Sequence, residues 1–173
     1  GGYRIYTTID MDKQDILQKS LDEELISDIT TNDDGVYELQ GAAVCIDNAT
    51  GKVTAIVGGR SQSIPGYTLN RGYQSPRQPG SAIKPLIVYA PQLERGYTPE
   101  TMVKDSYIEG GPSDGGNYEG SITLREAVVK SKNVVAYRLY TELTQSVGLE
   151  YLFQMKFAHL TMSDRDNPVA CLG

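Results

Sequence analysis

The sequence predicts an α+β fold in which strands come early in the chain and helices dominate the later part. Residues 3–60 contain an alternating segment, leucines at helical spacing and two short apolar runs. Residues 81–160 carry mainly helical patterns. With 173 residues, 39% of them hydrophobic, the chain is long enough to bury a core. We therefore expect a single domain over residues 1–173.

The first part of the chain is expected to form a strand, a helix and a hairpin. Residues 3–9 alternate in the manner of a short strand. Asp10 can cap a helix over residues 11–26, in which leucines recur at every fourth position. The apolar runs 42–46 and 52–57 flank a loop of about five residues that ends in glycine, which is typical of a β-hairpin.

Two long segments are expected to be loops. Residues 58–80 are rich in Gly, Pro and Ser, and a connection of this length is usually functional or disordered. Residues 94–120 contain two clusters of glycine and are also expected to lack regular structure. The first of these segments carries four arginine or asparagine side chains, Arg60, Asn70, Arg71 and Arg77.

Helices are expected around and after these loops. Residues 81–93 predict a helix that Pro91 should kink or end, because proline has no N–H to donate. Thr123 begins a further helix, and a second apolar pattern follows it. Ser131-Lys132-Asn133 falls at or near the junction of the two, and a last helix is expected over about 149–157.

Composition excludes several classes of function. The formal net charge is −6, and Lys and Arg do not cluster, so we expect no nucleic-acid partner. Cys45 and Cys171 match no metal-ligand spacing, so neither a metal nor a cofactor is expected. Cys45 lies in an apolar run, which favours a small buried side chain, and a disulfide between the two cysteines stays open. No apolar stretch approaches the ~20 residues of a membrane span, and no signal peptide is present.

Ser81 and Lys84 are the first candidates for catalysis. They follow the turn signal Pro79-Gly80, so Ser81 is expected in the first turn of a helix. Positions i and i+3 share a helix face, roughly 5–6 Å apart at Cβ, so Lys84 can reach towards the hydroxyl of Ser81. Unpaired N–H groups at the helix start would favour developing negative charge. Taken alone, the pair also fits a capping serine with a solvated lysine.

Ser131 and Asn133 add a second motif. Each is an ordinary residue at a helix junction, but S-x-x-K followed by S-x-N from a neighbouring helical segment matches one catalytic plan. In that plan a nucleophilic serine lies one turn before a lysine, and a second serine and an asparagine face them.

The residues around both motifs resemble class A penicillin-binding proteins. Arg77-Gln78-Pro79-Gly80-Ser81-Ala82-Ile83-Lys84-Pro85 is similar to the active-site segment of that family. Further matching segments, in chain order, are Thr7-Thr8-Ile9-Asp10, Gly41-Ala42-Ala43-Val44, Thr50-Gly51-Lys52-Val53, Val57-Gly58-Gly59-Arg60, Asn70-Arg71, Glu94-Arg95-Gly96-Tyr97-Thr98-Pro99, Ile122-Thr123-Leu124-Arg125-Glu126-Ala127 and Ser131-Lys132-Asn133-Val134-Val135-Ala136. The resemblance covers nearly the whole chain.

The resemblance implies a β-lactamase/transpeptidase-like fold and a peptidoglycan D,D-transpeptidase that cross-links stem peptides. Ser81 would attack the D-Ala-D-Ala stem peptide and form an acyl-enzyme, and β-lactams would acylate the same serine. Lys84 would need a pKa lowered by burial to act as base. Asn133 would orient Lys84 or hold substrate backbone, and Ser131 would relay the proton to the leaving group.

The resemblance also implies a location and further parts. Relatives act at the extracytoplasmic face of the bacterial membrane and carry a membrane anchor and a glycosyltransferase domain, neither of which lies in this chain. The family's third motif, Lys-Thr/Ser-Gly on a core strand, is also absent. We therefore expect a partial transpeptidase domain, lacking the C-terminal sheet strands and inactive by itself, whose missing half is a separate chain or has been cut away. Self-association through strand pairing or helix exchange is a further expectation.

Alternative functions stay open at this point. A D,D-carboxypeptidase or serine β-lactamase would share the chemistry and differ in the acyl acceptor. A non-catalytic β-lactam-sensing or cell-wall-binding module would keep Ser81 and Lys84 without turnover. A structural fragment with no activity is the third alternative.

Overall fold

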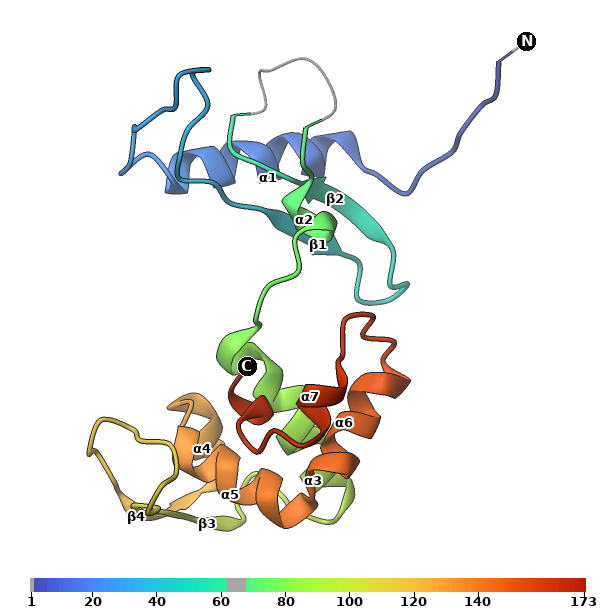
Figure 1. The fold of residues 1–173 in the computed structure, drawn as a ribbon. Helices are drawn as coiled ribbons and strands as arrows, with labels where there is room; N and C mark the ends of the chain where they lie inside the picture. Colours follow the sequence, from blue (N-terminus) through green and yellow to red (C-terminus); the bar gives the residue numbers. More distant parts are fainter. Residues whose placement is uncertain (1, 62–67) are drawn as a thin grey trace. The chain divides into compact units, whose positions relative to one another are not determined.

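The computed structural model describes residues 2–61 and 68–173, which form two compact units, Gly1–Pro76 and Arg77–Gly173 (Figure 1). Each unit has its own small antiparallel sheet and its own helices. All four candidate catalytic residues belong to the second unit. Within the described ranges, no helix is long and apolar enough to cross a membrane.

The first unit consists of a helix packed on a hairpin. Helix α1 (Met11–Glu24) packs against β2 (Val53–Val57), which pairs with β1 (Ala43–Ile46) in antiparallel register. Asp10 caps α1 by accepting hydrogen bonds from the N–H groups of Asp12 and Lys13. The predicted helix and hairpin are confirmed, and the helix is two residues shorter at its C-terminal end.

Residues 3–9 form no strand, contrary to the expectation from their alternation. The side chains of Tyr3 and Ile5 are 99% and 85% exposed. The segment contacts β2 near its end, where Thr8 Oγ1 donates to Val53 O at 2.5 Å, and the Asp10 N–H that follows donates to Thr54 O at 2.8 Å. A strand requires a neighbouring backbone, and the side chain of Gln14 instead pairs with both backbone groups of Ile56, at 2.8 and 2.9 Å. That contact occupies the edge of β2 on which residues 3–9 would have to pair.

The segment 58–80 is only partly a loop. It contains the short helix α2 (Arg71–Gln74), which Asn70 caps through its side chain. Arg60 is buried, lies 3.7 Å from the ring centroid of Tyr37 and donates to Asp28 O. Residues 62–67 of this predicted loop lie outside the described residues. The structure thus gives Arg60 a packing role within the first unit.

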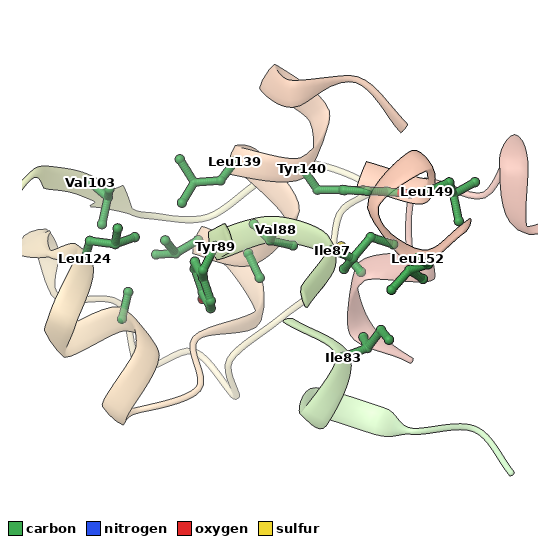
Figure 2. Close-up of a cluster of buried hydrophobic side chains, with 14 of the residues drawn as sticks. Ile83, Ile87, Val88, Tyr89, Val103, Leu124, Leu139, Tyr140, Leu149 and Leu152 are labelled. Atoms are coloured by element: carbon green, nitrogen blue, oxygen red, sulfur yellow. The ribbon is translucent and has the colours of Figure 1, made fainter. Parts of the chain in front are cut away.

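The second unit is mainly helical and surrounds one hydrophobic core. Its elements are η1 (Gly80–Ile83), η2 (Pro85–Tyr89), α3 (Ala90–Glu94), β3 (Met102–Asp105), β4 (Gly120–Thr123), α4 (Leu124–Val129), α5 (Asn133–Leu143), α6 (Gln145–Gln154), α7 (Met162–Arg165) and η3 (Ala170–Leu172). Figure 2 shows η2 in the centre of the core, with Ile87 and Val88 lying among side chains of α5 and α6. The segment that carries Lys84 is therefore the buried centre of this unit.

Two expectations for this unit were wrong in detail. The predicted loop 94–120 contains β3, which pairs with β4 over four residues, too few for its alternation to be recognised in the sequence. The helix predicted over about 149–157 is α6, which begins at Gln145 and ends at Gln154. Its earlier start includes Gly148, a residue that is unfavourable in a helix unless packing requires it.

Pro91 does not end the helix that follows Ser81. The turn before it is a π-helix, in which Ala90 N–H donates to Pro85 O across five residues. This change of register places Pro91 at the second position of α3, where its missing N–H removes no helical hydrogen bond. The helical segment continues to Glu94, and Ser81 lies in its first turn as predicted.

Gly148 allows α6 to approach the centre of the core. An added Cβ would lie 2.5 Å from Tyr140 Cε2 and 2.7 Å from Ile87 O. The second atom belongs to the backbone and cannot rotate away. This close contact therefore fixes the distance between α6 and the buried segment η2.

We predict that Gly148→Ala destabilises the chain, although alanine is the better helix former by about 1 kcal/mol. The clash with Ile87 O should cost about 1–3 kcal/mol, and this cost should exceed the gain in propensity. Urea unfolding measures the difference. The matched control is Glu150→Ala at an exposed position of the same helix, for which a change within about 0.5 kcal/mol is expected. A raised unfolding midpoint for Gly148→Ala would contradict this packing.

Candidate active site

The candidate site is organised around the ammonium group of Lys84. Its side chain is 2% exposed and lies where η1 joins η2. The Nζ atom donates to Ser131 O at 2.7 Å, to Ser131 Oγ at 3.1 Å and to Asn133 Oδ1 at 2.7 Å. Three donors and three acceptors satisfy the ammonium completely. The structure therefore brings three of the four predicted residues into direct contact.

The surroundings of Lys84 favour its neutral form. Burial lowers the pKa of its ammonium below the ordinary value, and the negative charge of Asp114 and the nearby Cys171 oppose this only in part. A lysine with an ordinary pKa of ~10.4 is protonated at neutral pH and cannot accept a proton. The direction of the shift is the one that a general base requires.

Ser131 adopts a backbone conformation that is rare for its residue type. Its φ is 52°, in the left-handed region, which costs a residue with a side chain of order 1–3 kcal/mol. It lies between α4 and α5, where Lys132 N–H donates back to Ala127 O at 2.9 Å. This tight turn lets both Ser131 O and Ser131 Oγ accept from Lys84. Backbone strain here coincides with the candidate site.

Lys132 holds this turn in place, a role that the sequence did not reveal. Its side chain is 6% exposed, and Nζ lies 2.8 Å from Asp105 Oδ2 and 3.0 Å from Glu119 Oε1. It also donates to Asn117 O at 2.7 Å. Hydrogen bonding to Asp105, a fully buried carboxylate, raises the pKa of Lys132. The middle residue of the S-x-N motif thus anchors the motif to the ends of β3 and β4.

Asn133 begins α5 and is held from the loop between β3 and β4. Its backbone N–H donates to Asp114 Oδ1 at 2.8 Å, and Val134 N–H donates to Asp114 Oδ2 at 3.2 Å. A polar cavity of about 530 Å³ opens beside it. The cavity is lined by Ser113, Asp114, Gly115, Asn117, Glu119, Lys130, Ser131, Lys132 and Asn133.

Ser81 lies one turn before Lys84 on the same helical segment. Its carbonyl accepts from Lys84 N–H, while its side chain is exposed. In the part of the chain that the structure describes, Ser81 Oγ makes no hydrogen bond with Lys84 Nζ, which is engaged by Ser131 and Asn133. The preceding Gly80 has φ 56°, which suits glycine and turns the chain into η1. Ser81 and Ser131 thus present exposed hydroxyls above a buried lysine.

The two cysteines do not extend the site. Both are free, which answers the question of a disulfide, and Cys45 is only half-buried in β1. Cys171 in η3 is fully buried, and burial raises the pKa of its thiol to about 12. A thiol with such a pKa stays protonated at neutral pH and is a poor nucleophile. In the described residues, no cluster of potential metal ligands is present.

Comparison with known proteins supports the resemblance stated from the motifs. Residues 41–170 match the family described as penicillin binding protein transpeptidase domain. The chain is 36% identical over 169 residues to penicillin-binding protein 1A of Clostridium perfringens (strain 13 / Type A), covering 87% of this chain and 25% of that protein. It is 35% identical over 191 residues to penicillin-binding protein 1A of Clostridium acetobutylicum, covering 99% and 23%. The chain thus spans about a quarter of the length of these curated relatives.

Solved structures show the same fold. PonA1 of Mycobacterium tuberculosis in complex with penicillin V matches with a TM-score of 0.74 and 24% identity, over 98% of this chain and 46% of that chain. Penicillin-binding protein 1A of Haemophilus influenzae matches with a TM-score of 0.62 and 31% identity, over 78% and 21%. The predicted α+β transpeptidase-like fold is confirmed. The chain belongs to the penicillin-binding protein transpeptidase domain family.

Proposed function

We propose that this chain supplies the nucleophile side of a peptidoglycan D,D-transpeptidase that cross-links stem peptides through an acyl-serine intermediate. The observation that carries the proposal is the buried Lys84, with its lowered pKa, held by Ser131 and Asn133 one turn after an exposed serine. Family membership supports the same reaction class. This chain matches about a quarter of the length of its relatives, so we propose that the activity of the whole protein also depends on segments outside this chain.

Acyl transfer would begin at Ser81. Its Oγ bonds to the carbonyl carbon of the penultimate D-Ala of a stem peptide, and the hydroxyl proton passes to neutral Lys84. The peptide bond to the terminal D-Ala then breaks, and the leaving amine receives the proton through Ser131 Oγ, which already lies 3.1 Å from Lys84 Nζ. An amine of a neighbouring stem peptide attacks the acyl-serine and regenerates the hydroxyl. The proton that Ser81 lost leaves with the terminal D-Ala amine, and a proton from the acceptor amine, passed through Lys84, restores the Ser81 hydroxyl.

Asn133 would act in orientation rather than in proton transfer. Its amide oxygen accepts from Lys84 at 2.7 Å and so fixes the direction of the amine. For Ser81 to be deprotonated, Lys84 Nζ must exchange one of its three present partners for Ser81 Oγ. The exposed position of Ser81 leaves its hydroxyl accessible to substrate.

β-Lactams would react with the same serine. The lactam carbonyl stands in for the D-Ala carbonyl, and opening of the ring leaves the departing nitrogen attached to the acyl group. PonA1 of Mycobacterium tuberculosis, which has the same fold, has been solved in complex with penicillin V. A D,D-carboxypeptidase, a serine β-lactamase or a non-catalytic penicillin sensor would share this first step, and acceptor-dependent release of the acyl group distinguishes them.

The proposed setting is the extracytoplasmic face of a bacterial membrane, in a longer protein with an anchor and a glycosyltransferase domain. The names of the curated relatives and their greater length support this setting. Self-association of the chain through strand pairing or helix exchange stays a prediction. The exposed Val44 and Ile46 on the two-stranded sheet of the first unit favour it.

We predict that Ser81→Ala abolishes covalent labelling by a fluorescent penicillin in the full-length parent protein, because no acyl bond can form without Oγ. Gel fluorescence after denaturation measures the labelling. The matched control is Ser121→Ala, which changes an exposed serine of β4 in the same unit and should retain labelling. Labelling that persists in Ser81→Ala would refute the assignment of the nucleophile.

We predict that acylation of the parent protein accelerates as pH rises through the lowered pKa of Lys84, because only the neutral amine accepts a proton. Lys84→Arg should slow acylation at least about 100-fold and remove this rise, since a guanidinium is not deprotonated in proteins. Stopped-flow acylation between pH 5 and about 10 measures both effects. Lys104→Arg, at an exposed lysine of β3 in the same unit, is the control and should keep the wild-type profile. A near-normal rate in Lys84→Arg would exclude Lys84 as the base.

We predict that the isolated 173-residue chain is inactive as a transpeptidase. Its sequence contains no Lys-Thr-Gly or Lys-Ser-Gly triplet, so it lacks the strand that in the family supplies an oxyanion N–H and a lysine for the substrate carboxylate. Loss of one oxyanion donor alone costs about 10²–10³ in rate. Turnover of a thioester or of a D-Ala-D-Ala peptide is the measurement, with the full-length protein as positive control. Robust turnover by the isolated chain would contradict the prediction.

A further inference from the structure

Helix α5 begins without a cap from its own N-terminal residue. Lys132 is the N-cap residue, and its side chain makes no capping hydrogen bond, because it is engaged with Asp105 and Glu119. The first backbone N–H groups of a helix have no partner within the helix. In α5 the first two, those of Asn133 and Val134, are instead taken by the two carboxylate oxygens of Asp114. The cap comes from a residue 19 positions earlier in the chain.

The same loop contacts Asn133 a second time. Ser113 O accepts from Asn133 Nδ2 at 3.5 Å, while Asn133 Oδ1 accepts from Lys84 at 2.7 Å. The amide group is therefore oriented with its nitrogen towards the loop and its oxygen towards the lysine. The loop is held in shape by a turn in which Asn117 N–H donates to Asp114 O. Asp114 thus determines where the Asn133 main chain lies, and Ser113 determines how its side chain points.

Asp114 also acts on Lys84 through its charge. The two groups that oppose the effect of burial on Lys84 are Asp114 and Cys171. Cys171 is a neutral thiol at physiological pH, because burial raises its pKa to about 12. The Asp114 carboxylate, which is hydrogen-bonded to Asn133, is therefore the charged group that opposes the effect of burial on Lys84.

We propose that Asp114 is a positioning residue of the acyl-transfer site, which holds the start of α5 so that Asn133 Oδ1 meets Lys84 and which places a carboxylate on the residue that binds the lysine. The inference rests on the proposed function of Lys84 as the base. It extends the site beyond the four motif residues to the loop between β3 and β4. Its two parts are separable, because an asparagine retains a capping oxygen and loses the charge.

Two variants of the full-length protein separate these parts. Asp114→Asn keeps one acceptor oxygen but turns its NH₂ group towards the second N–H, so at high pH its acylation by fluorescent penicillin should be about 3-fold slower than wild type and faster than that of Asp114→Ala. Its pH midpoint should move to lower pH, because removing a negative charge disfavours the Lys84 ammonium. Asp114→Ala loses both contributions, so its acylation should be about 10-fold slower than wild type on the high-pH plateau, and its pH midpoint should be lowered like that of Asp114→Asn. Rescue by the conservative variant distinguishes positioning from a general loss of structure.

Glu109→Gln is the matched control, since it removes one negative charge at an exposed position of the same loop. It should leave both the rate and the pH midpoint unchanged. An unchanged midpoint in Asp114→Asn, or a wild-type rate in Asp114→Ala, would overturn the proposal.

The titration of Lys84 can be measured without acylation, so this test of Asp114 is independent of the test of the proposed function. Without Ser81-dependent labelling of the wild-type protein, the proposed function fails. The titration of Lys84 can still be followed by ¹³C NMR of lysine-labelled protein, with the resonance assigned from its loss in Lys84→Arg. A lower midpoint in Asp114→Asn than in wild type supports the role of Asp114, and identical midpoints refute it.

Discussion

The contact between Lys84 and the turn at Ser131 is the interaction on which the second unit depends. It joins the buried helical segment η1–η2 to the junction of α4 and α5, two regions 47 residues apart in the chain. A buried ammonium is costly unless each of its protons finds an acceptor, and all three do. The surrounding structure serves to keep both sides of this contact in place.

Each side of the contact is fixed by a different kind of force. On the lysine side, the segment η1–η2 is held by the apolar packing of Ile87 and by the close approach of α6 at Gly148. On the opposite side, polar contacts hold the turn, with Lys132 bound to Asp105 and Asp114 bound to the start of α5. Apolar packing thus fixes the position of the Lys84 backbone in the core, and directional hydrogen bonds fix the positions of the oxygen atoms that accept from its ammonium group.

The sequence was sufficient for the parts of this arrangement that depend on local pattern. Leucine spacing predicted α1, two apolar runs around a loop that ends in glycine predicted the hairpin, and S-x-x-K with S-x-N predicted that Lys84, Ser131 and Asn133 would meet. In the described residues, Lys84 Nζ bonds to Ser131 and Asn133 rather than to the Ser81 hydroxyl. The sequence was insufficient where residues far apart in the chain determine the local structure. Residues 3–9 alternate but form no strand, because the side chain of Gln14 occupies the edge of β2. Pro91 is tolerated because a π-turn precedes it, and Asp114 caps a helix across 19 residues. Neither leaves a signal at its own position.

Lys84 and Lys132 show how one small region assigns opposite tasks to two lysines. Both are almost fully buried, and both make three polar contacts, but the partners differ in charge. Lys84 meets neutral oxygens of Ser131 and Asn133, so burial dominates and its pKa falls. Lys132 meets the carboxylates of Asp105 and Glu119, so its pKa rises and it stays charged. Because the two carboxylates bind Lys132 and not Lys84, Lys132 stays charged, whereas Lys84 can lose and regain its proton.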